Sequence, residues 1–334
     1  MKHPLFFTAF LSLILCAGCQ SERSKLAKIN LTIEVQRFDR ELLTLNPDSL
    51  PLLVPALQQK YGDFFTYYCK GIIDVGMPQD SGFWGYLAEF LSDDIVRESY
   101  TEVQRTFSDC SELNAKLTDA FKRYKLHFPD DKTPRIVAYV SGFNQSIMLA
   151  EGVIGVGLDK YLGADYPLYP QLGFYKYVTR KMYPSKIPAD IMDALAEALF
   201  PYNVRQDELL GRMVWEGKRL YFARQMLPAE PDTAIFGFTQ KELDVCHNNE
   251  SYIWMYLIEN KLLFSTNTFT IDKFTEDRPF TQEFSREAPG RAANWVGYRI
   301  VSRYMERASG VTLPQLMLDN NHRQILEKSG YNPR

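Results

Sequence analysis

Two helix patterns occupy the stretch IPADIMDALAEALFPYNVRQDELLGRMVWEGKRLYFARQMLP, residues 187–228, and they meet at a short Pro-Tyr-Asn turn. Pro188 suits the first turn of a helix, where the N–H that proline lacks has no partner to lose. The first helix carries an inward apolar stripe at helical spacing, formed by Ile191, Met192, Leu195 and Leu199. The second helix has one face formed by Leu209, Met213, Glu216 and Leu220. We expect these two helices to lie at the centre of a mostly helical fold.

The first helix contains a degenerate version of a metal-binding motif. Residues 196–200, AEALF, have the shape of H-E-x-x-H with both histidines replaced. That motif binds zinc because histidines at i and i+4 share one helix face, while the glutamate acts as a base. Zinc prefers nitrogen and sulfur ligands, so we expect no metal and no other cofactor here. Glu197 is then a vestigial catalytic candidate, with a chance match in a common helical string as the alternative.

Glu216 is the second vestigial candidate, since it places a carboxylate on the apolar stripe of the second helix. Residues 215–221, WEGKRLY, are similar to the E-G-x-x-x-Y segment that follows H-E-x-x-H in some zinc peptidases. Gly217 inside a helix costs about 1 kcal/mol relative to alanine unless packing needs it. Without the histidines, neither glutamate is expected to carry out catalysis.

The rest of the chain predicts further helices and a small sheet. An opening strand is expected from Leu31 (LTIEVQRFDR), because apolar residues alternate with polar ones there, and two buried strands are expected within 135–143 and 152–163. Helical spacing covers 48–70, 83–107, 112–127, 171–200, 206–226, 241–248, 251–262 and 290–307, and a short pair of helices is expected near the end. The predicted class is α+β, mostly α, with many helices around one small sheet on a degenerate zincin-like metallopeptidase scaffold.

The bulk composition and the motif search exclude several functions. A net charge of −3 and a pI of about 5.9 do not suit nucleic-acid binding, which needs a basic surface. The glycines at 152, 155 and 157 are in the order G-x-x-G-x-G, which does not match a dinucleotide loop. The serine hydrolase elbow G-x-S-x-G is absent.

A tyrosine-rich run, DYPLYPQLGFYKYVTRKMYP at residues 165–184, is a candidate binding surface. Large amphipathic aromatic side chains beside basic residues are enriched at interfaces, although they are also common in protein cores. The candidates for contact with a peptide or glycan are Tyr166, Tyr169, Tyr175 and Tyr177. Core packing is the alternative role for these four residues.

The N-terminus, MKHPLFFTAFLSLILCAGC, has the pattern of a bacterial lipoprotein signal. Lys2 precedes an apolar run that is too short to span a bilayer, and small residues stand directly before Cys19. Cys16 departs from the aliphatic residue usual three places before the lipidated cysteine. We expect residues 1–18 to be removed, residues 19–30 to form a lipidated tether that begins at Cys19, and residues 31–334 to form one helical domain.

The combination of these blocks resembles the gliding motility lipoprotein GldB family. The similarity is carried by the signal together with RFDRELLTLNPDSL, YVSGFN, GVIGVGLDKYLG, MVWEGKRLYFARQMLP and the ending PGRAANWVGYRIVSRYM…ILEKSGYNP. The resemblance implies an envelope lipoprotein of Bacteroidota-like bacteria, connected with gliding and its associated secretion machinery. It also implies a distant relation to zinc peptidases of the H-E-x-x-H type, whose activity does not carry over because the histidines are missing.

The sequence therefore predicts a non-enzymatic, lipid-anchored scaffold that binds a protein partner in the cell envelope and holds to the membrane through Cys19. Two alternatives stay open: a hydrolase that uses Glu197 and Glu216 without the usual ligands, and a lipoprotein that binds glycans or peptides through the tyrosine-rich run. Gln20, which follows the cysteine, is not the aspartate that retains lipoproteins at the inner membrane. The expected location is the outer membrane, facing the periplasm, with the inner membrane as the alternative.

Overall fold

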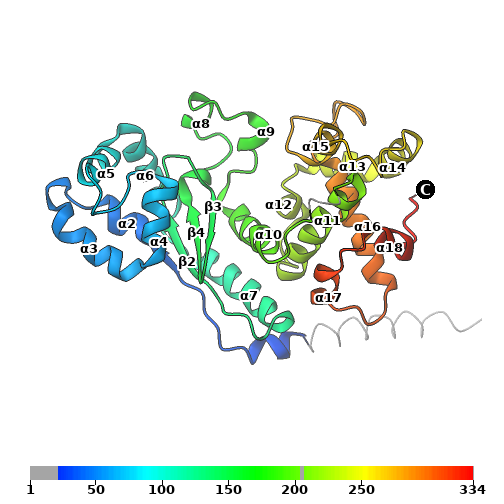
Figure 1. The fold of residues 1–334 in the computed structure, drawn as a ribbon, viewed down its shortest axis with the longest axis horizontal. Coiled ribbons are helices and arrows are strands. Elements are labelled where there is room, and N and C mark those ends of the chain that lie inside the picture. Colours follow the sequence, from blue (N-terminus) through cyan, green and yellow to red (C-terminus); the bar gives the residue numbers. More distant parts are fainter. Residues whose placement is uncertain (1–21, 204–206, 334) are drawn as a thin grey trace, which may run out of the picture.

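The structure is a computed structural model that describes residues 22–203 and 207–333. The predicted signal peptide, Cys19 and the first residues of the tether lie outside the described residues. Residues 22–27 are helical, and Leu26 is buried. The predicted fold class is confirmed, because helices predominate and surround one small mixed sheet (Figure 1).

The sheet has four strands in the order β1-β2-β4-β3. Their bounds are β1 (Val35–Arg37), β2 (Arg135–Tyr139), β3 (Ile147–Ala150) and β4 (Val153–Gly157). Strands β1, β2 and β4 run parallel, and β3 pairs antiparallel with β4 at the edge. The three predicted strands are confirmed, with an opening strand shorter than expected, whereas β3 was not predicted. It forms a hairpin with β4 across a two-residue turn that includes Gly152, whose φ is 69°.

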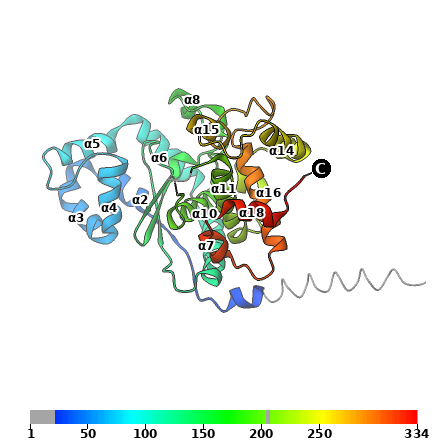
Figure 2. The ribbon, with the colours of Figure 1, turned by 45° about the vertical axis from the view of Figure 1, so that its right-hand side comes forward.

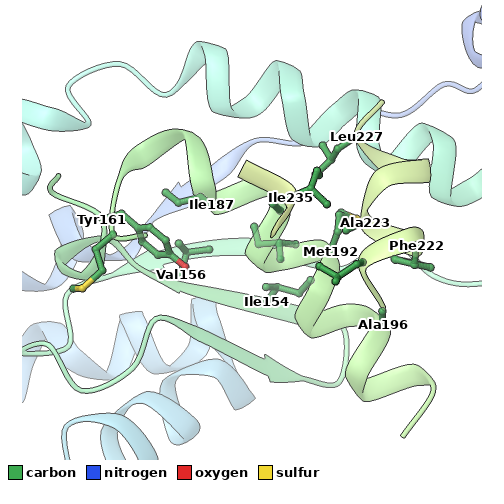
Figure 3. Packing of buried hydrophobic residues seen from close by; sticks show 14 of the residues in the cluster. Ile154, Val156, Tyr161, Ile187, Met192, Ala196, Phe222, Ala223, Leu227 and Ile235 are labelled. Atoms are coloured by element: carbon green, nitrogen blue, oxygen red, sulfur yellow. The ribbon is translucent and has the colours of Figure 1, made fainter. Parts of the chain in front are cut away.

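The two faces of β4 show why its glycines are needed. A Cβ at Gly155 would lie 2.8 Å from the Tyr139 ring and 3.1 Å from Phe64 of α4 (Asp63–Tyr67), so this face of the sheet is closely covered. The neighbouring side chains of Ile154 and Val156 lie on the other face, with residues of the following helices (Figure 3). The strand is buried on both faces, as its continuous apolar sequence predicts.

Of the helices between β1 and β2, those predicted over 48–70 and 83–107 are divided, the one predicted over 112–127 is confirmed, and a short one at 38–43 was not predicted. Their bounds are α2 (Phe38–Leu43), α3 (Leu50–Tyr61), α4 (Asp63–Tyr67), α5 (Phe83–Ser92), α6 (Asp94–Thr106) and α7 (Ser111–His127). Gly62, with φ of 57°, divides the helix predicted over 48–70. Asp93 divides the next one, because its side chain accepts a hydrogen bond from Val96 N (2.9 Å) and caps α6.

The helices after the sheet are mostly where the pattern places them. Their bounds are α8 (Leu168–Gln171), α9 (Lys176–Thr179), α10 (Ile187–Leu199), α11 (Leu209–Met226), α12 (Asp232–Phe236), α13 (Gln240–Asn248), α14 (Glu250–Glu259), α15 (Thr268–Thr275), α16 (Ala292–Arg307), α17 (Leu313–Leu318) and α18 (His322–Ser329). Two elements were not predicted, α12 and α15, and the region 171–186 contains only short helical turns. None of the helices in the described part of the chain is both long and apolar enough to cross a bilayer.

The sheet separates two groups of helices. Figures 1 and 2 show α2–α5 on one side, and α10, α11 and α16 on the other. Helix α7 packs against α10 and α11. Nearly all buried apolar side chains from Ile33 to Tyr331 form one contiguous cluster.

Helices α11 and α16 make the most extensive contact between any two elements, and two glycines lie at their crossing. A Cβ at Gly217 would lie 2.2 Å from the carbonyl carbon of Gly297, and a Cβ at Gly297 would lie 1.8 Å from Met213 O. Nothing larger than hydrogen fits at either position. Packing therefore needs Gly217, and its cost in helix propensity is offset by the close contact of the two backbones.

Candidate functional site

Helix α10 has one face in the core and one facing a cleft. Its buried residues include Ile187, Met192 and Ala196, which pack in the cluster drawn in Figure 3. The opposite face carries Asp190, Asp193 and Glu197, all of which line the cleft. The spacing of three and four residues puts these carboxylates in one row along the helix.

Arg219 of α11 lies against this row and joins three carboxylates. Its Nε and Nη2 atoms donate to Asp193 Oδ1 (3.0 Å) and Oδ2 (2.6 Å), which is a bidentate pair. Its Nη2 also lies 2.9 Å from Glu197 Oε2, and its Nη1 lies 3.4 Å from Glu216 Oε1. The guanidinium is 4.7 Å from the Trp215 ring, which holds it as a cation–π neighbour. Arg219 is thus a buried cation at the centre of an acidic cluster.

The electrostatics of this cluster differ from one carboxyl group to another. Burial raises the pKa of Glu216 to about 7, and the nearby Arg219 only partly opposes that shift. Burial also opposes the charge on Arg219, but the carboxylates of Asp193, Glu216 and Glu197 raise its pKa above the ordinary value. Arg219 therefore stays charged at every physiological pH, while Glu216 titrates close to neutrality.

The structure shows which positions of α10 at i and i+4 face the cleft. Ala196 is fully buried, and Phe200 packs against Phe128 (5.9 Å between ring centroids), so neither lies on the cleft face. The pair at i and i+4 that meets Arg219 is Asp193 and Glu197. An H-E-x-x-H-like frame on the cleft face of α10 would be 193–197, DALAE, three residues earlier than AEALF, because the face with Ala196 is turned into the core. The relation of either segment to H-E-x-x-H stays a prediction.

In the frame 193–197 the positions of the motif would fall on different residues. Asp193 and Glu197 stand where the two histidines would be, and Ala194 stands where the catalytic glutamate would be. Glu216, three residues before Arg219, contributes the third carboxylate. The guanidinium occupies the centre of the group, and within residues 22–203 and 207–333 no set of three or more His, Cys, Asp and Glu side chains is arranged to hold a metal ion.

The cleft beside this cluster has a volume of about 360 Å³. Its wall opposite α10 carries Lys181 and Arg291, both paired with Asp277. Arg291 Nε lies 2.8 Å from Asp277 Oδ1 as an ion pair, without the geometry of a hydrogen bond. The cleft is therefore acidic along α10, where Lys186 is the one cation among the described residues of its lining. Its other walls carry Lys160, Lys181 and Arg291 against Asp277. A cavity of this volume suits a small ligand or a few residues of a peptide.

The four predicted tyrosines divide into two pairs. Tyr166 and Tyr169 are buried, and the Tyr169 hydroxyl donates to Asp159 O (2.9 Å) and accepts from Leu162 N (3.0 Å). Those contacts serve packing, so burial removes both side chains from ligand contact. Tyr175 and Tyr177 instead lie at the surface with stacked rings, 5.8 Å between centroids, in an open hollow of about 660 Å³.

The structure brings Glu197 and Glu216 together through Arg219, which sequence reasoning did not single out. Asp193 and Trp215 were missed as well. A signal for all of them exists in the sequence, since Asp193 lies four residues before Glu197 and Arg219 lies three residues after Glu216, so each pair shares a helix face. Tyr175 and Tyr177 lie apart from the Arg219 cluster, in a separate hollow at α9.

The titration of Glu216 gives a testable pH dependence. The carboxyl is protonated more readily in the folded chain than in the unfolded one, so stability falls as the pH rises from about 4.5 to about 7 and stays at the lower value above it. Glu216→Gln, which mimics the neutral form, is expected to gain about 1–3 kcal/mol over wild type between pH 5 and pH 7.5. Urea unfolding at the two pH values measures the difference. Glu259→Gln, on the exposed side of α14, is the control, and it is expected to leave the free energy of unfolding unchanged at both pH values.

Fold and site together define an α+β protein, mostly helical, whose central carboxylates are held by an arginine of the same chain. The sequence model described as gliding motility protein GldB matches residues 19–333, so the chain belongs to the GldB family. The resemblance found in the sequence is confirmed, and the chain is a gliding-motility-related protein of a lipoprotein family, for which the cell envelope is the location. Neither the curated proteins nor the solved structures contain a significant match to it. The likeness to a zincin scaffold stays a prediction.

Proposed function

We propose that this protein is a non-enzymatic binding scaffold of the gliding machinery and its associated secretion system, anchored to the envelope by lipid at Cys19. The observation that carries the proposal is Arg219, whose guanidinium occupies the centre of the Asp193, Glu197 and Glu216 cluster. A guanidinium has no open coordination position and cannot polarise a carbonyl as a bound zinc ion does. The methyl group of Ala194, at the base position of the motif, cannot take a proton.

The decisive experiment measures metal and proteolysis together. The mature lipoprotein, purified in detergent, is expected to contain substoichiometric zinc and to leave unstructured peptides intact with or without a chelator. Stoichiometric zinc together with chelator-sensitive cleavage would overturn the proposal. Asp193→His/Ala194→Glu/Glu197→His/Arg219→Ala, which installs the missing motif, is the comparison for zinc uptake.

A hydrolase without metal is the second candidate, and one observation favours it. A carboxyl whose pKa is raised to about 7 suits general acid–base catalysis, and Glu216 has that property and is linked through Arg219 to Glu197 in the wall of the cleft. Glu197→Gln and Glu216→Gln distinguish the two functions in a gliding host. Spreading colonies from both variants support the scaffold, and loss of spreading from Glu216→Gln, with normal protein levels, supports the hydrolase. Loss from Glu197→Gln alone fits a role of this surface carboxylate in partner binding.

The lipid anchor gives a prediction about location. Cys19→Ala is expected to leave the protein out of the membrane fraction, because the acyl chains supply about 0.8 kcal/mol of membrane affinity per buried CH₂ group. Cell fractionation with immunoblotting measures this, and Cys16→Ala is the matched control, since Cys16 belongs to the segment that is removed. We propose that the anchored protein lies in the outer membrane and faces the periplasm, and sucrose-gradient separation of the two membranes tests that location against the inner membrane. A Cys19→Ala protein that stays with the membranes would show that another segment holds it there.

A further inference from the structure

Strand β3 is an open edge of the sheet, and its pairing register shows which backbone groups face outward. Gly157 N donates to Ser146 O (2.8 Å), and Met148 lies opposite Gly155. Bonded and non-bonded pairs alternate along an antiparallel ladder, so Met148 bonds to β4. Ile147 and Leu149 therefore turn their N–H and C=O groups away from the sheet.

One of these outward positions is covered by a side chain. Gln145 Nε2 donates to Ile147 O (2.7 Å). In the described part of the chain no protein group is hydrogen-bonded to the outward N–H or C=O of Leu149. All four residues of β3 are only half-buried. The edge at Leu149 is thus ready to pair with another strand.

The start of this edge borders the cleft. Ser146 and Ile147 line the cavity of about 360 Å³, together with the acidic face of α10. That face lines the cleft with three carboxylates, Asp190, Asp193 and Glu197, and the cations paired with them are Lys186 and Arg219. This side of the cleft is therefore acidic even with Arg219 in place.

We propose that the cleft receives an extended segment of a partner protein, which adds a strand to the β3 edge at Leu149 and directs a basic side chain at Glu197. The proposal rests on the scaffold function above and specifies the chemistry of its partner. Backbone pairing at a free edge supplies affinity that does not depend on sequence, and pockets beside the edge supply the specificity.

The exposure of the charged groups in the cleft decides which charge we expect on the side chain of the bound segment. The Glu197 side chain is 56% exposed, so a second cation can reach it beside Arg219. Across the cleft, the side chains of Lys181 and Arg291 are 19% and 22% exposed and share Asp277. Glu197 is the most exposed of these charged side chains, and its carboxylate favours lysine or arginine in the bound segment.

The probe for this proposal is a set of octapeptides, selected for affinity to the mature lipoprotein from a randomised pool with one fixed central lysine. We expect the selected peptides to bind and to slow hydrogen exchange at the Leu149 amide by tenfold or more, since that N–H gains a partner only in the complex. Replacing the lysine with norleucine is expected to weaken binding about fivefold, as is usual for a partly exposed ion pair. N-methylation of the peptide backbone abolishes strand pairing and is expected to abolish binding.

Two variants of one residue test the backbone contact directly. Leu149→Pro removes the outward N–H but no bond to β4, and proline is tolerated on an edge strand at such a position. Both variants lose the packing of the Leu149 side chain, so we expect Leu149→Pro to melt at the temperature of Leu149→Ala. Leu149→Pro is expected to lose peptide binding, while Leu149→Ala, which retains the N–H, binds as wild type does. Glu197→Gln is expected to weaken peptide binding to the same extent as replacing the lysine of the peptide with norleucine.

The outcomes separate this proposal from the scaffold function. Peptides that bind at Leu149 and are then cleaved would confirm the cleft as the binding site and overturn the non-enzymatic scaffold function. Failure to select any peptide that protects Leu149, or equal binding by Leu149→Pro and Leu149→Ala, would overturn the cleft as the partner site. The lipid-anchored, non-enzymatic role would be unaffected by that result.

Discussion

Arg219→Ala is expected to lower the free energy of unfolding by about 2–4 kcal/mol, because it leaves the carboxylates of Asp193, Glu197 and Glu216 without their shared cation. Removing one partner of a fully buried ion pair typically costs about 3–5 kcal/mol. Asp193 and Glu197 are partly exposed to water here, which reduces the loss. Urea unfolding at pH 7.5 measures the change.

A chemical rescue sharpens this prediction. Methylguanidinium at about 20 mM is expected to recover part of the lost stability, since it binds only the folded variant and can occupy the vacated space above Trp215. Potassium chloride at the same ionic strength is the control and gives less recovery. Arg219→Lys, which keeps the charge but loses the bidentate contact with Asp193, is expected to fall between wild type and alanine. An alanine variant as stable as wild type would show that the cluster does not depend on its arginine.

Gly297→Ala is expected to be the most damaging single-methyl change in the chain. Its Cβ would lie 1.8 Å from Met213 O, so α11 and α16 would have to move apart along their whole contact. We expect the free energy of unfolding to fall by about 4 kcal/mol or more, as severe overpacking does, and the yield of soluble protein to be low. Soluble yield and the urea midpoint report the effect.

Gly85→Ala in α5 is the matched control for that variant. Nothing lies within 4 Å of a Cβ at Gly85, so alanine is expected to leave stability unchanged or raise it by up to about 1 kcal/mol. Gly217→Ala tests the crossing from the other helix, where the added Cβ would meet the backbone of Gly297. A soluble Gly297→Ala protein with the wild-type midpoint would mean that the two helices can separate at little cost.

Periodicity in the sequence predicted the long helices, because their apolar stripes repeat over three turns or more. It failed where a single residue interrupts a helix by its own backbone or capping preference, as Gly62 and Asp93 do. Strand β3 was missed because Ile147–Ala150 is a short apolar run without alternation, which periodicity cannot assign. The glycine of the turn that follows it was the available signal, since Gly152 adopts a positive φ in a two-residue hairpin.

The site was harder to predict than the fold. Glu197 and Glu216 were found from motif shapes, but the register on α10 depends on which face meets the sheet, and a pattern match does not contain that information. Arg219 was missed because a motif search looks for ligands of a metal and not for a cation supplied by the chain itself. Tyr166 and Tyr169 illustrate the opposite error, since composition alone does not separate a buried ring from an exposed one.

The hydrogen bond from Gln145 to Ile147 O has a consequence for crowding. Lipoproteins tethered to one membrane meet each other at high local density, and bare strand edges on neighbouring copies would join. The amide of Gln145 already satisfies this carbonyl, so a neighbour would have to displace it for a net gain of only about 1 kcal/mol per new hydrogen bond. The side chain of Gln145 thereby weakens pairing of any second strand, that of an identical molecule included, at Ile147 and leaves the edge at Leu149 for a better-matched strand.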